Sequence, residues 1–135
     1  MQELAKHIDH TLLRPDTVLA DVRRVCEEAI QHQFAAVCVP PLFMRDARRM
    51  LGERNRVQLS TVVGFPMGYS AIAAKSEEIK RALDEGADEI DAVVNLAAIK
   101  SGNWNLVGHD VAGLALATHM RGKALKLTIE CGFLT

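Results

Sequence analysis

Short apolar segments alternate with amphipathic segments along the whole chain, and this alternation limits the possible folds more than any other feature. The apolar segments are rich in β-branched residues and end near turn-forming or charged residues, which is typical of buried strands. Strands are therefore expected at residues 8–12, 34–39, 57–63, 89–94 and 125–129. Between them apolar residues recur at the spacing of one helical face. This predicts helices over residues 18–30, 42–51, 71–85 and from 107 to about 122.

The predicted order is βαβαβαβαβ, within a single α/β domain of residues 1–135. Strands that alternate with helices form parallel sheets through right-handed crossovers. Two architectures fit this order. The first is an incomplete (β/α)8 TIM barrel that covers about strands 1–5, and the alternative is an open, flavodoxin-like doubly wound sheet. Periodicity does not decide between them.

Charge and cysteine content argue against several function classes. The chain has 16 Lys and Arg against 17 Asp and Glu, so it lacks the basic surplus that neutralises nucleic-acid phosphates. It has no run of 18 apolar residues, which argues against a membrane span, and its first residues do not resemble a signal peptide. Three cysteines without a CxxC pair indicate a reducing, cytoplasmic location. The five histidines are scattered, so we expect no metal site.

Polar side chains inside the predicted strands are the candidates for function, because a buried parallel strand should be almost wholly apolar. Asp9 and Thr11 share one face of the first strand, Asp91 lies within the fourth, and Lys126 lies within the fifth. If these faces converge, Asp9, Asp91 and Lys126 line one cavity. Such a set can move protons beside a carbonyl group, and the alternative is a buried ion pair that only neutralises itself. Cys38 has no evident base beside it and is expected to be a packed thiol.

Several segments strongly resemble the deoxyribose-phosphate aldolase family, in one collinear order. The matching segments are IDHTLLRP (8–15), VCVPP (37–41), STVVGFPMG (60–68), ADEIDAVVN (87–95), KSGNW (100–104) and LKLTIECG (125–132). The resemblance implies a (β/α)8 barrel and a lyase that needs no metal or cofactor. Members of this family reversibly cleave 2-deoxy-D-ribose 5-phosphate to acetaldehyde and D-glyceraldehyde 3-phosphate through a lysine Schiff base.

The resemblance also implies roles for five residues. It makes Asp91 the acid–base group of a proton relay and places Lys126 near the reacting centre. Asp9, Thr11 and Cys38 match positions that face the substrate. The implied partners are a small phosphorylated sugar and an aldehyde.

Two lysine motifs of the family are absent from these 135 residues. The family's Schiff-base lysine lies in a Lys-Thr-Ser-Thr-Gly block on the sixth strand, and a second lysine lies in a Lys-Pro-Ala-Gly-Gly block on the seventh. We therefore expect the chain alone to lack aldolase activity. Because open sheet edges favour association, we also expect a homo-oligomer that completes the barrel core. Two other functions stay open, namely a non-catalytic self-associating scaffold and a small flavodoxin-like binding domain.

Overall fold

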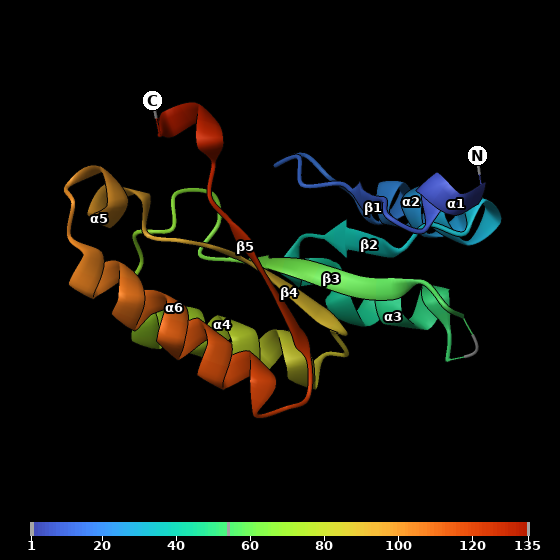
Figure 1. Cartoon of the computed structure of the whole chain (residues 1–135). Coiled ribbons are helices and arrows are strands. Elements are labelled where there is room, and N and C mark those ends of the chain that lie inside the picture. Colours follow the sequence, from blue (N-terminus) through green and yellow to red (C-terminus); the bar gives the residue numbers. More distant parts are fainter. Residues whose placement is uncertain (1, 54, 135) are drawn as a thin grey trace.

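A computed structural model describes residues 2–53 and 55–134 (Figure 1). The elements are α1 (Gln2–Ala5), β1 (Asp9–Thr11), α2 (Leu19–His32), β2 (Ala36–Val39), η1 (Pro41–Phe43), α3 (Met44–Leu51), β3 (Gln58–Val63), α4 (Ile72–Asp84), β4 (Glu89–Val93), α5 (Leu96–Lys100), α6 (Trp104–His119), β5 (Ala124–Thr128) and η2 (Cys131–Phe133). All five predicted strands are present. The four predicted helices correspond to α2, α3, α4 and α6, whereas the short elements α1, η1, α5 and η2 were not predicted. Among the described helices, none combines the length and apolar character needed to cross a bilayer.

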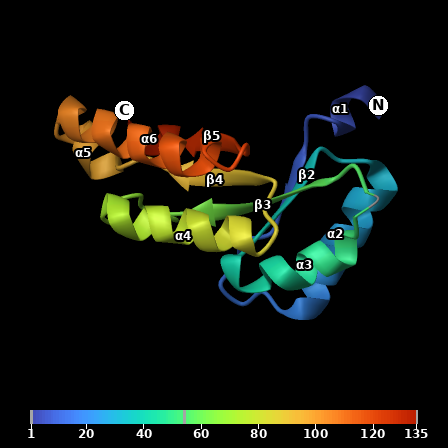
Figure 2. The same ribbon diagram turned by 90° about the horizontal axis from the view of Figure 1, so that it is seen from below.

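The five strands form one parallel sheet in the order β1-β2-β3-β4-β5. A doubly wound sheet reverses its strand order at a switch point and carries helices on both faces. Here each strand lies beside the strand that precedes it in the chain, and the long helices α2, α3, α4 and α6 cover one side of the sheet (Figure 2). This arrangement is that of a (β/α)8 barrel. The predicted incomplete TIM barrel is therefore confirmed, and the flavodoxin-like alternative is wrong.

The outer face of the sheet, which the helices cover, carries the hydrophobic core. Side chains alternate between the two faces of a strand, so every second residue of β2, β3 and β4 meets the apolar stripes of the helices. The core includes Val37, Val39, Leu59, Val63, Ile90 and Ala92 from the strands, and Val22, Ala29, Met44, Ala47, Ile79 and Leu114 from the helices. Burial of this apolar surface is the main force that holds the helices on the sheet.

The inner face of the sheet, toward the barrel axis, carries most of the polar side chains of the strands, together with the apolar Ala36, Val62 and Val93. By the same alternation and the strand register it carries Asp9, Thr11, Cys38, Ser60, Glu89, Asp91, Lys126 and Thr128. The sheet curls around this face so far that the Lys126 ammonium of β5 donates to the Asp9 carboxylate of β1. These two strands are the opposite edges of the sheet. The inner face is therefore a concave polar surface rather than a flat one.

A fully buried ion pair joins α4 to α6 beside the carboxyl end of β4. Lys75 Nζ donates to the two carboxylate oxygens of Asp110 at 2.9 and 3.0 Å, and to the Val93 carbonyl oxygen at 2.9 Å. The Asn95 backbone N–H donates to Asp110 Oδ2 at 3.1 Å. Each of the three ammonium protons thus has an acceptor, which offsets the cost of removing the charge from water. The pair fixes the backbone where the chain leaves β4.

The Lys75 side chain also explains a glycine in the loop that follows β3. Gly64 has φ +65°, and a Cβ at this position would lie 2.8 Å from Lys75 Cε. The Gly64 backbone N–H donates to Glu78 Oε2 at 2.7 Å. Gly68, at the end of the same loop, has φ +71°, and a Cβ there would lie 1.9 Å from the Val94 carbonyl oxygen. The loop after β3 is therefore packed against α4 and against the end of β4.

Removing one partner of the buried pair should destabilise the chain more than removing both. Lys75→Met leaves the Asp110 carboxylate buried without its counter-charge, so the free energy of unfolding should fall by about 3–5 kcal/mol. The double variant Lys75→Met with Asp110→Leu removes both charges and should lose less. Urea unfolding followed by circular dichroism measures all three proteins.

Lys80→Met is the matched control, because Lys80 lies on the same helix but is exposed. Its ammonium lies 3.9 Å from Glu77 Oε1 on the surface. Its effect should stay within about 1 kcal/mol. A Lys75→Met variant that unfolds with the same free energy as Lys80→Met would contradict the structural role of the pair.

Candidate active site

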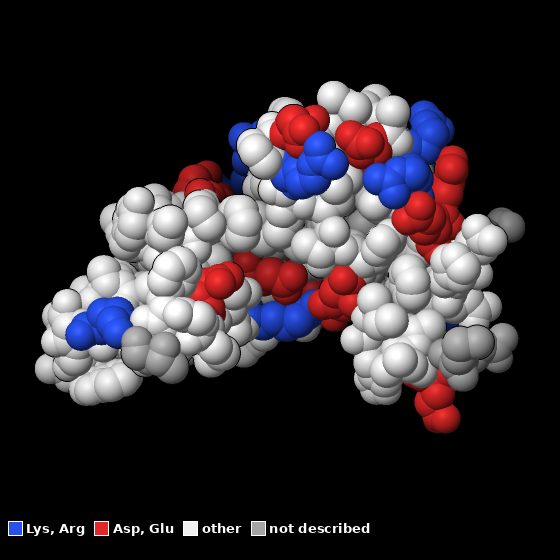
Figure 3. Space-filling model, turned by 90° about the horizontal axis from the view of Figure 1, so that it is seen from above, with Lys and Arg blue, Asp and Glu red and all other residues white. Residues whose placement is uncertain are grey.

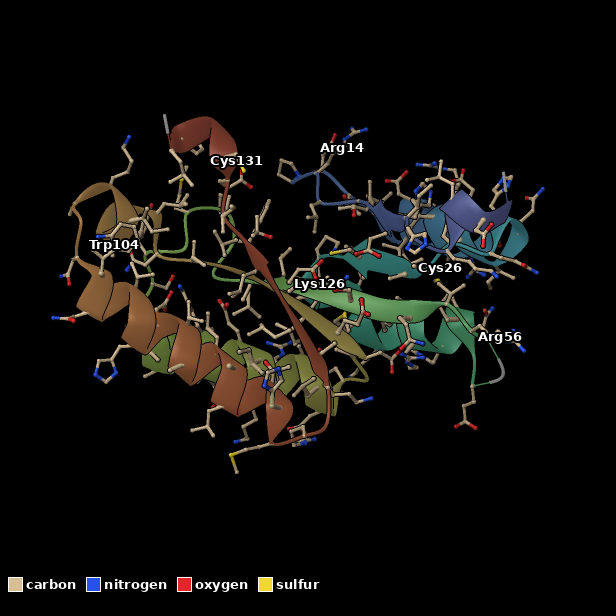
Figure 4. The ribbon with its side chains drawn as sticks, in the orientation of Figure 1. Arg14, Cys26, Arg56, Trp104, Lys126 and Cys131 are labelled. Carbon is tan, nitrogen blue, oxygen red and sulfur yellow. The ribbon has the colours of Figure 1, made fainter. Side chains whose placement is uncertain are left out.

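Three carboxylates surround the ammonium group of Lys126 on the inner face of the sheet. Lys126 Nζ lies 2.6 Å from Glu89 Oε2 and 3.5 Å from Asp91 Oδ1, and it donates to Asp9 Oδ2. Figure 4 shows the Lys126 side chain crossing the concave face from β5. In the space-filling view, acidic side chains gather around a basic group in the hollow of this face (Figure 3). The cluster has three carboxylates against one ammonium.

The strand register brings Asp91 and Lys126 together. Asp91 of β4 pairs directly with Lys126 of β5, and paired residues in neighbouring strands point to the same face. Glu89 lies two residues before Asp91 and so shares this face. Asp9 joins the cluster from β1, at the other edge of the sheet. Strand register therefore brings three of the side chains together, and the curvature of the sheet adds Asp9 from the third strand.

The short strand β1 is held in place by contacts on its outer side. His10 Nε2 lies 2.6 Å from Glu28 Oε2 of α2, and the His10 ring packs against Phe34 with 5.2 Å between ring centroids. The hydrogen bond with His10 lowers the pKa of the Glu28 carboxyl group. Because side chains alternate along a strand, fixing His10 toward α2 turns Asp9 toward the inner face.

The carboxylates control the protonation of Lys126. Partial burial by itself lowers the pKa of an ammonium, but the hydrogen bonds to Asp9 and Glu89 and the negative charge of Asp91 outweigh it and raise the pKa of Lys126 well above its usual value. A free amine must lose its proton before it can attack a carbonyl carbon. In this arrangement Lys126 is a cation that organises carboxylates rather than a nucleophile.

Cys38 and Ser60 lie buried beside the same cluster. Cys38 of β2 pairs with Ser60 of β3, and both residues are almost fully buried. Burial raises the pKa of the Cys38 thiol, the negative charge of Asp91 raises it further, and Lys126 and Ser60 only partly oppose this. Cys38 is thus held as a neutral thiol against Asp91 and is not an activated nucleophile.

The structure brings together most of the residues that the sequence singled out. Asp9, Asp91 and Lys126 form the predicted cluster, and Cys38 adjoins it. Thr11 is at the exposed end of β1, where its hydroxyl donates to the Asp9 carbonyl oxygen at 3.0 Å. The catalytic and substrate-contacting roles of these residues remain predictions.

Sequence reasoning left three charged residues out of its list of candidates. Glu89 is a direct partner of Lys126, and its spacing of two from Asp91 was a signal that could have added it. The pair of Lys75 and Asp110 was missed because a lysine on a helix is ordinarily read as exposed. A signal did exist, since Lys75 lies four residues before the buried Ile79 on the same stripe of α4.

The raised pKa of Lys126 predicts slow modification by aldehydes. In reductive methylation with formaldehyde only the neutral amine reacts, so at pH 8 Lys126 should react at least about tenfold more slowly than the exposed Lys80. Since the pKa of Lys126 is raised, its rate of modification should keep rising with pH into strongly alkaline solution. Peptide mapping by mass spectrometry measures both residues in one sample.

Asp9→Asn and Glu89→Gln remove one hydrogen-bonded negative charge each and should accelerate the modification of Lys126. Asp16→Asn serves as the control, because Asp16 pairs with Arg14 on the exposed surface. Fast methylation of Lys126 in the unaltered chain would show that the cluster does not hold its proton.

Comparisons with known proteins identify the family of the chain. Residues 4–131 match the family model described as DeoC/LacD family aldolase. A deoxyribose-phosphate aldolase from Thermococcus kodakarensis is 40% identical over 135 residues, which are 99% of this chain and 60% of that protein. The chain therefore spans about three fifths of the length of this curated relative.

Solved structures agree with the sequence comparison. A candidate deoxyribose-phosphate aldolase from Coccidioides immitis superposes with a TM-score of 0.93 at 31% identity, over 99% of this chain and 52% of that one. The deoxyribose phosphate aldolase of Aeropyrum pernix, which is described as a unique tetramer, gives 0.82 at 31% identity over 93% of this chain and 52% of that one. The chain belongs to the DeoC/LacD family of aldolases.

Proposed function

We propose that this chain provides the proton-transfer and substrate-contacting part of a deoxyribose-phosphate aldolase site. The reaction is the reversible cleavage of 2-deoxy-D-ribose 5-phosphate to acetaldehyde and D-glyceraldehyde 3-phosphate. The observation that carries the proposal is the cluster of Asp9, Glu89 and Asp91 around Lys126 on the concave inner face. Its support is the membership of the chain in an aldolase family.

The chemistry of this cleavage requires repeated proton transfer. A lysine amine adds to C1 of the sugar, and loss of water from the adduct gives an iminium ion. The C2–C3 bond then breaks, its electrons form an enamine with the iminium, and the C3 hydroxyl loses its proton as it becomes the aldehyde of the three-carbon product. Protonation of the enamine carbon and hydrolysis release acetaldehyde. Asp91 is the carboxylate that we assign to these proton transfers.

The Schiff-base amine has to come from another lysine. The carboxylates around Lys126 raise its pKa, which opposes its attack on an aldehyde. We therefore assign the Schiff base to a lysine in the part of the barrel that the longer relatives possess and these 135 residues do not include. Lys126, whose ammonium lies 3.5 Å from Asp91 Oδ1, then orients the Asp91 carboxylate near the reacting carbon.

The remaining candidates contact the substrate in this proposal. Asp9 and Thr11 lie at one edge of the inner face, and Cys38 lies between them and Asp91. Small and hydroxylic side chains suit a short sugar with several hydroxyl groups. The three free cysteines, Cys26, Cys38 and Cys131, fit the cytoplasmic location that such a reaction would have.

A hybrid barrel tests the aldolase proposal directly. Residues 1–130 of this chain, joined to the remaining strands of the Thermococcus kodakarensis enzyme, should cleave 2-deoxyribose 5-phosphate, whereas this chain alone should not. In the hybrid, Asp91→Asn removes the acid–base group, and kcat should fall by at least about 100-fold. A coupled assay for D-glyceraldehyde 3-phosphate measures the rates.

The control in the hybrid is Asp16→Asn, which changes an exposed acid outside the inner face and should leave the rate within about twofold. A folded hybrid whose Asp91→Asn variant cleaves the sugar as fast as its parent would contradict the assignment of Asp91.

Association of the chain with itself is a second candidate, and exposed apolar side chains favour it. Leu116 of α6 and Met120, the residue that follows this helix, are 63% and 76% exposed, and Phe133 of η2 is 58% exposed. Trp104, at the start of α6, also projects from the surface (Figure 4). Leu116 and Met120 lie four residues apart and so share one side of the helix end, and exposed apolar groups of this kind are typical of a contact surface. We propose that the chain forms a homo-oligomer through α6.

Sedimentation velocity should find a dimer or a larger assembly at micromolar concentration. Leu116→Glu combined with Met120→Glu places charges on the exposed side of α6 and should shift the chain to monomer, while circular dichroism stays unchanged. Arg23→Glu is a control on an exposed part of α2. A folded monomer at high concentration would contradict self-association.

A further inference from the structure

A cavity lies at the amino end of the sheet, outside the candidate active site. Its volume is about 1090 Å³, which is large enough for a small-molecule ligand. It is bordered by the residue that follows α1, by the ends of α2 and α3, and by the loop that leads to β3. Figure 2 shows these segments at the end of the sheet where β2 and β3 begin. A (β/α)8 barrel carries out its chemistry at the opposite, carboxyl end of its strands, so this cavity is separate from the proposed aldolase site.

Part of the lining of this cavity is apolar. It includes Ile30 of α2, Leu51 of α3, and Phe34 and Val57, which lie shortly before β2 and β3. Ile30 is 39% exposed although it lies in a helix that packs on the core, and the Phe34 ring is half-buried. Apolar side chains that stay accessible in a hollow are typical of a ligand site. A ligand with an apolar body would release water from this surface on binding.

The polar part of the lining is positively charged. Lys6 and Arg56 come from segments far apart in the chain, and both are exposed. Within the part of the chain that the structure describes, neither forms an ion pair. Glu53 is the only acid among the described lining residues, so two cations against one carboxylate leave a formal charge of +1. Figure 4 shows Arg56 at this end of the molecule. A guanidinium and an ammonium together suit a doubly charged phosphate group.

Two carboxamide side chains complete the lining. Gln33 ends α2 with φ +55°, in the left-handed region that glycine adopts at a lower cost. A glutamine that is kept here in spite of this cost favours a role for its side chain in the cavity. Asn55 Oδ1 accepts from the Val57 backbone N–H at 3.1 Å. This bond orients the Asn55 side chain and leaves its amide hydrogens for an acceptor in the cavity.

We propose that this cavity binds a small phosphate monoester whose organic part is an apolar ring. The phosphate lies between Lys6 and Arg56, and the ring packs against Ile30 and Phe34, because aromatic rings stack favourably on one another. A sugar phosphate has the charge but lacks the apolar body, and a neutral ring lacks the charge. The site stands on its own lining and does not rest on the proposed aldolase function.

Isothermal titration calorimetry of this chain with phenyl phosphate, inorganic phosphate and phenol tests the site. At about pH 8 a phosphate monoester is doubly charged. Phenyl phosphate should bind at least about tenfold more tightly than inorganic phosphate, because burial of the ring adds to the attraction of the charge. Phenol should bind more weakly than phenyl phosphate by a similar factor. Equal affinity for phenyl phosphate and inorganic phosphate, or no saturation by phenyl phosphate below about 10 mM, would overturn the proposal.

Four single variants locate the bound ligand. Lys6→Gln and Arg56→Gln each remove one charge and should weaken phenyl phosphate binding by at least about fivefold. Ile30→Gln should weaken the binding of phenyl phosphate and leave that of inorganic phosphate unchanged. Arg23→Gln is the matched control, because Arg23 is an exposed arginine of α2 outside the lining, and it should stay within about twofold. Binding that is the same in Arg56→Gln and in Arg23→Gln would contradict the assignment.

A variant of the inner face separates this cavity from the proposed aldolase site. Asp9→Asn alters the cluster around Lys126 and should leave the affinity for phenyl phosphate unchanged. A change of affinity in Asp9→Asn with none in Arg56→Gln would place the ligand on the inner face and would also overturn the proposal. None of these measurements involves the cleavage of a sugar, so failure of the aldolase proposal in the hybrid barrel would leave their outcome readable.

Discussion

The contact between the Lys126 ammonium and the Asp9 carboxylate is the interaction on which the shape of the site depends. It joins β5 to β1, which are the two edges of the sheet and are 117 residues apart in the chain. An open sheet of five strands could flatten, and its inner side chains would then separate. Glu89 and Asp91 already lie beside the ammonium through the pairing of β4 with β5, and the contact adds Asp9 from the far edge of the sheet. The contact that closes the two edges of the sheet toward each other is thus also the contact that brings Asp9 into the cluster.

The two faces of the sheet have different roles, because the outer face stabilises the fold and the inner face carries the groups of the candidate site. The outer face is apolar and binds the helices, and the pair of Lys75 and Asp110 ties α4 and α6 to the end of β4. This leaves the inner face free of any need to supply the main core. It can therefore carry the acids Asp9, Glu89 and Asp91, which a wholly buried face without counter-charges would exclude. A (β/α)8 scaffold generally separates its stabilising and reacting parts in this way.

Local pattern was enough to predict the strands, the long helices and the face that carries Asp9, Asp91 and Lys126, because alternation within a strand is a local property. It did not decide between a barrel and a doubly wound sheet, because both have the same order of elements and differ only in which strands become neighbours. The contact of Lys75 with Asp110 could not be predicted from the sequence for a related reason. It joins residues 35 apart on two helices, and no spacing within either helix reveals the partner.

The two buried or half-buried lysines show why only one of them suits chemistry. Lys75 is fully buried, and its three protons meet the two oxygens of one carboxylate and one carbonyl group. Such an arrangement is saturated, so it can hold structure but has no group left to react. Lys126 is half-exposed and faces three carboxylates, which is more negative charge than one ammonium can neutralise. Asp91 makes the longest of the three contacts, 3.5 Å from its Oδ1 to the ammonium, whereas Asp9 and Glu89 lie closer. A carboxylate that is held loosely by the cation in a concave site is suited to proton transfer.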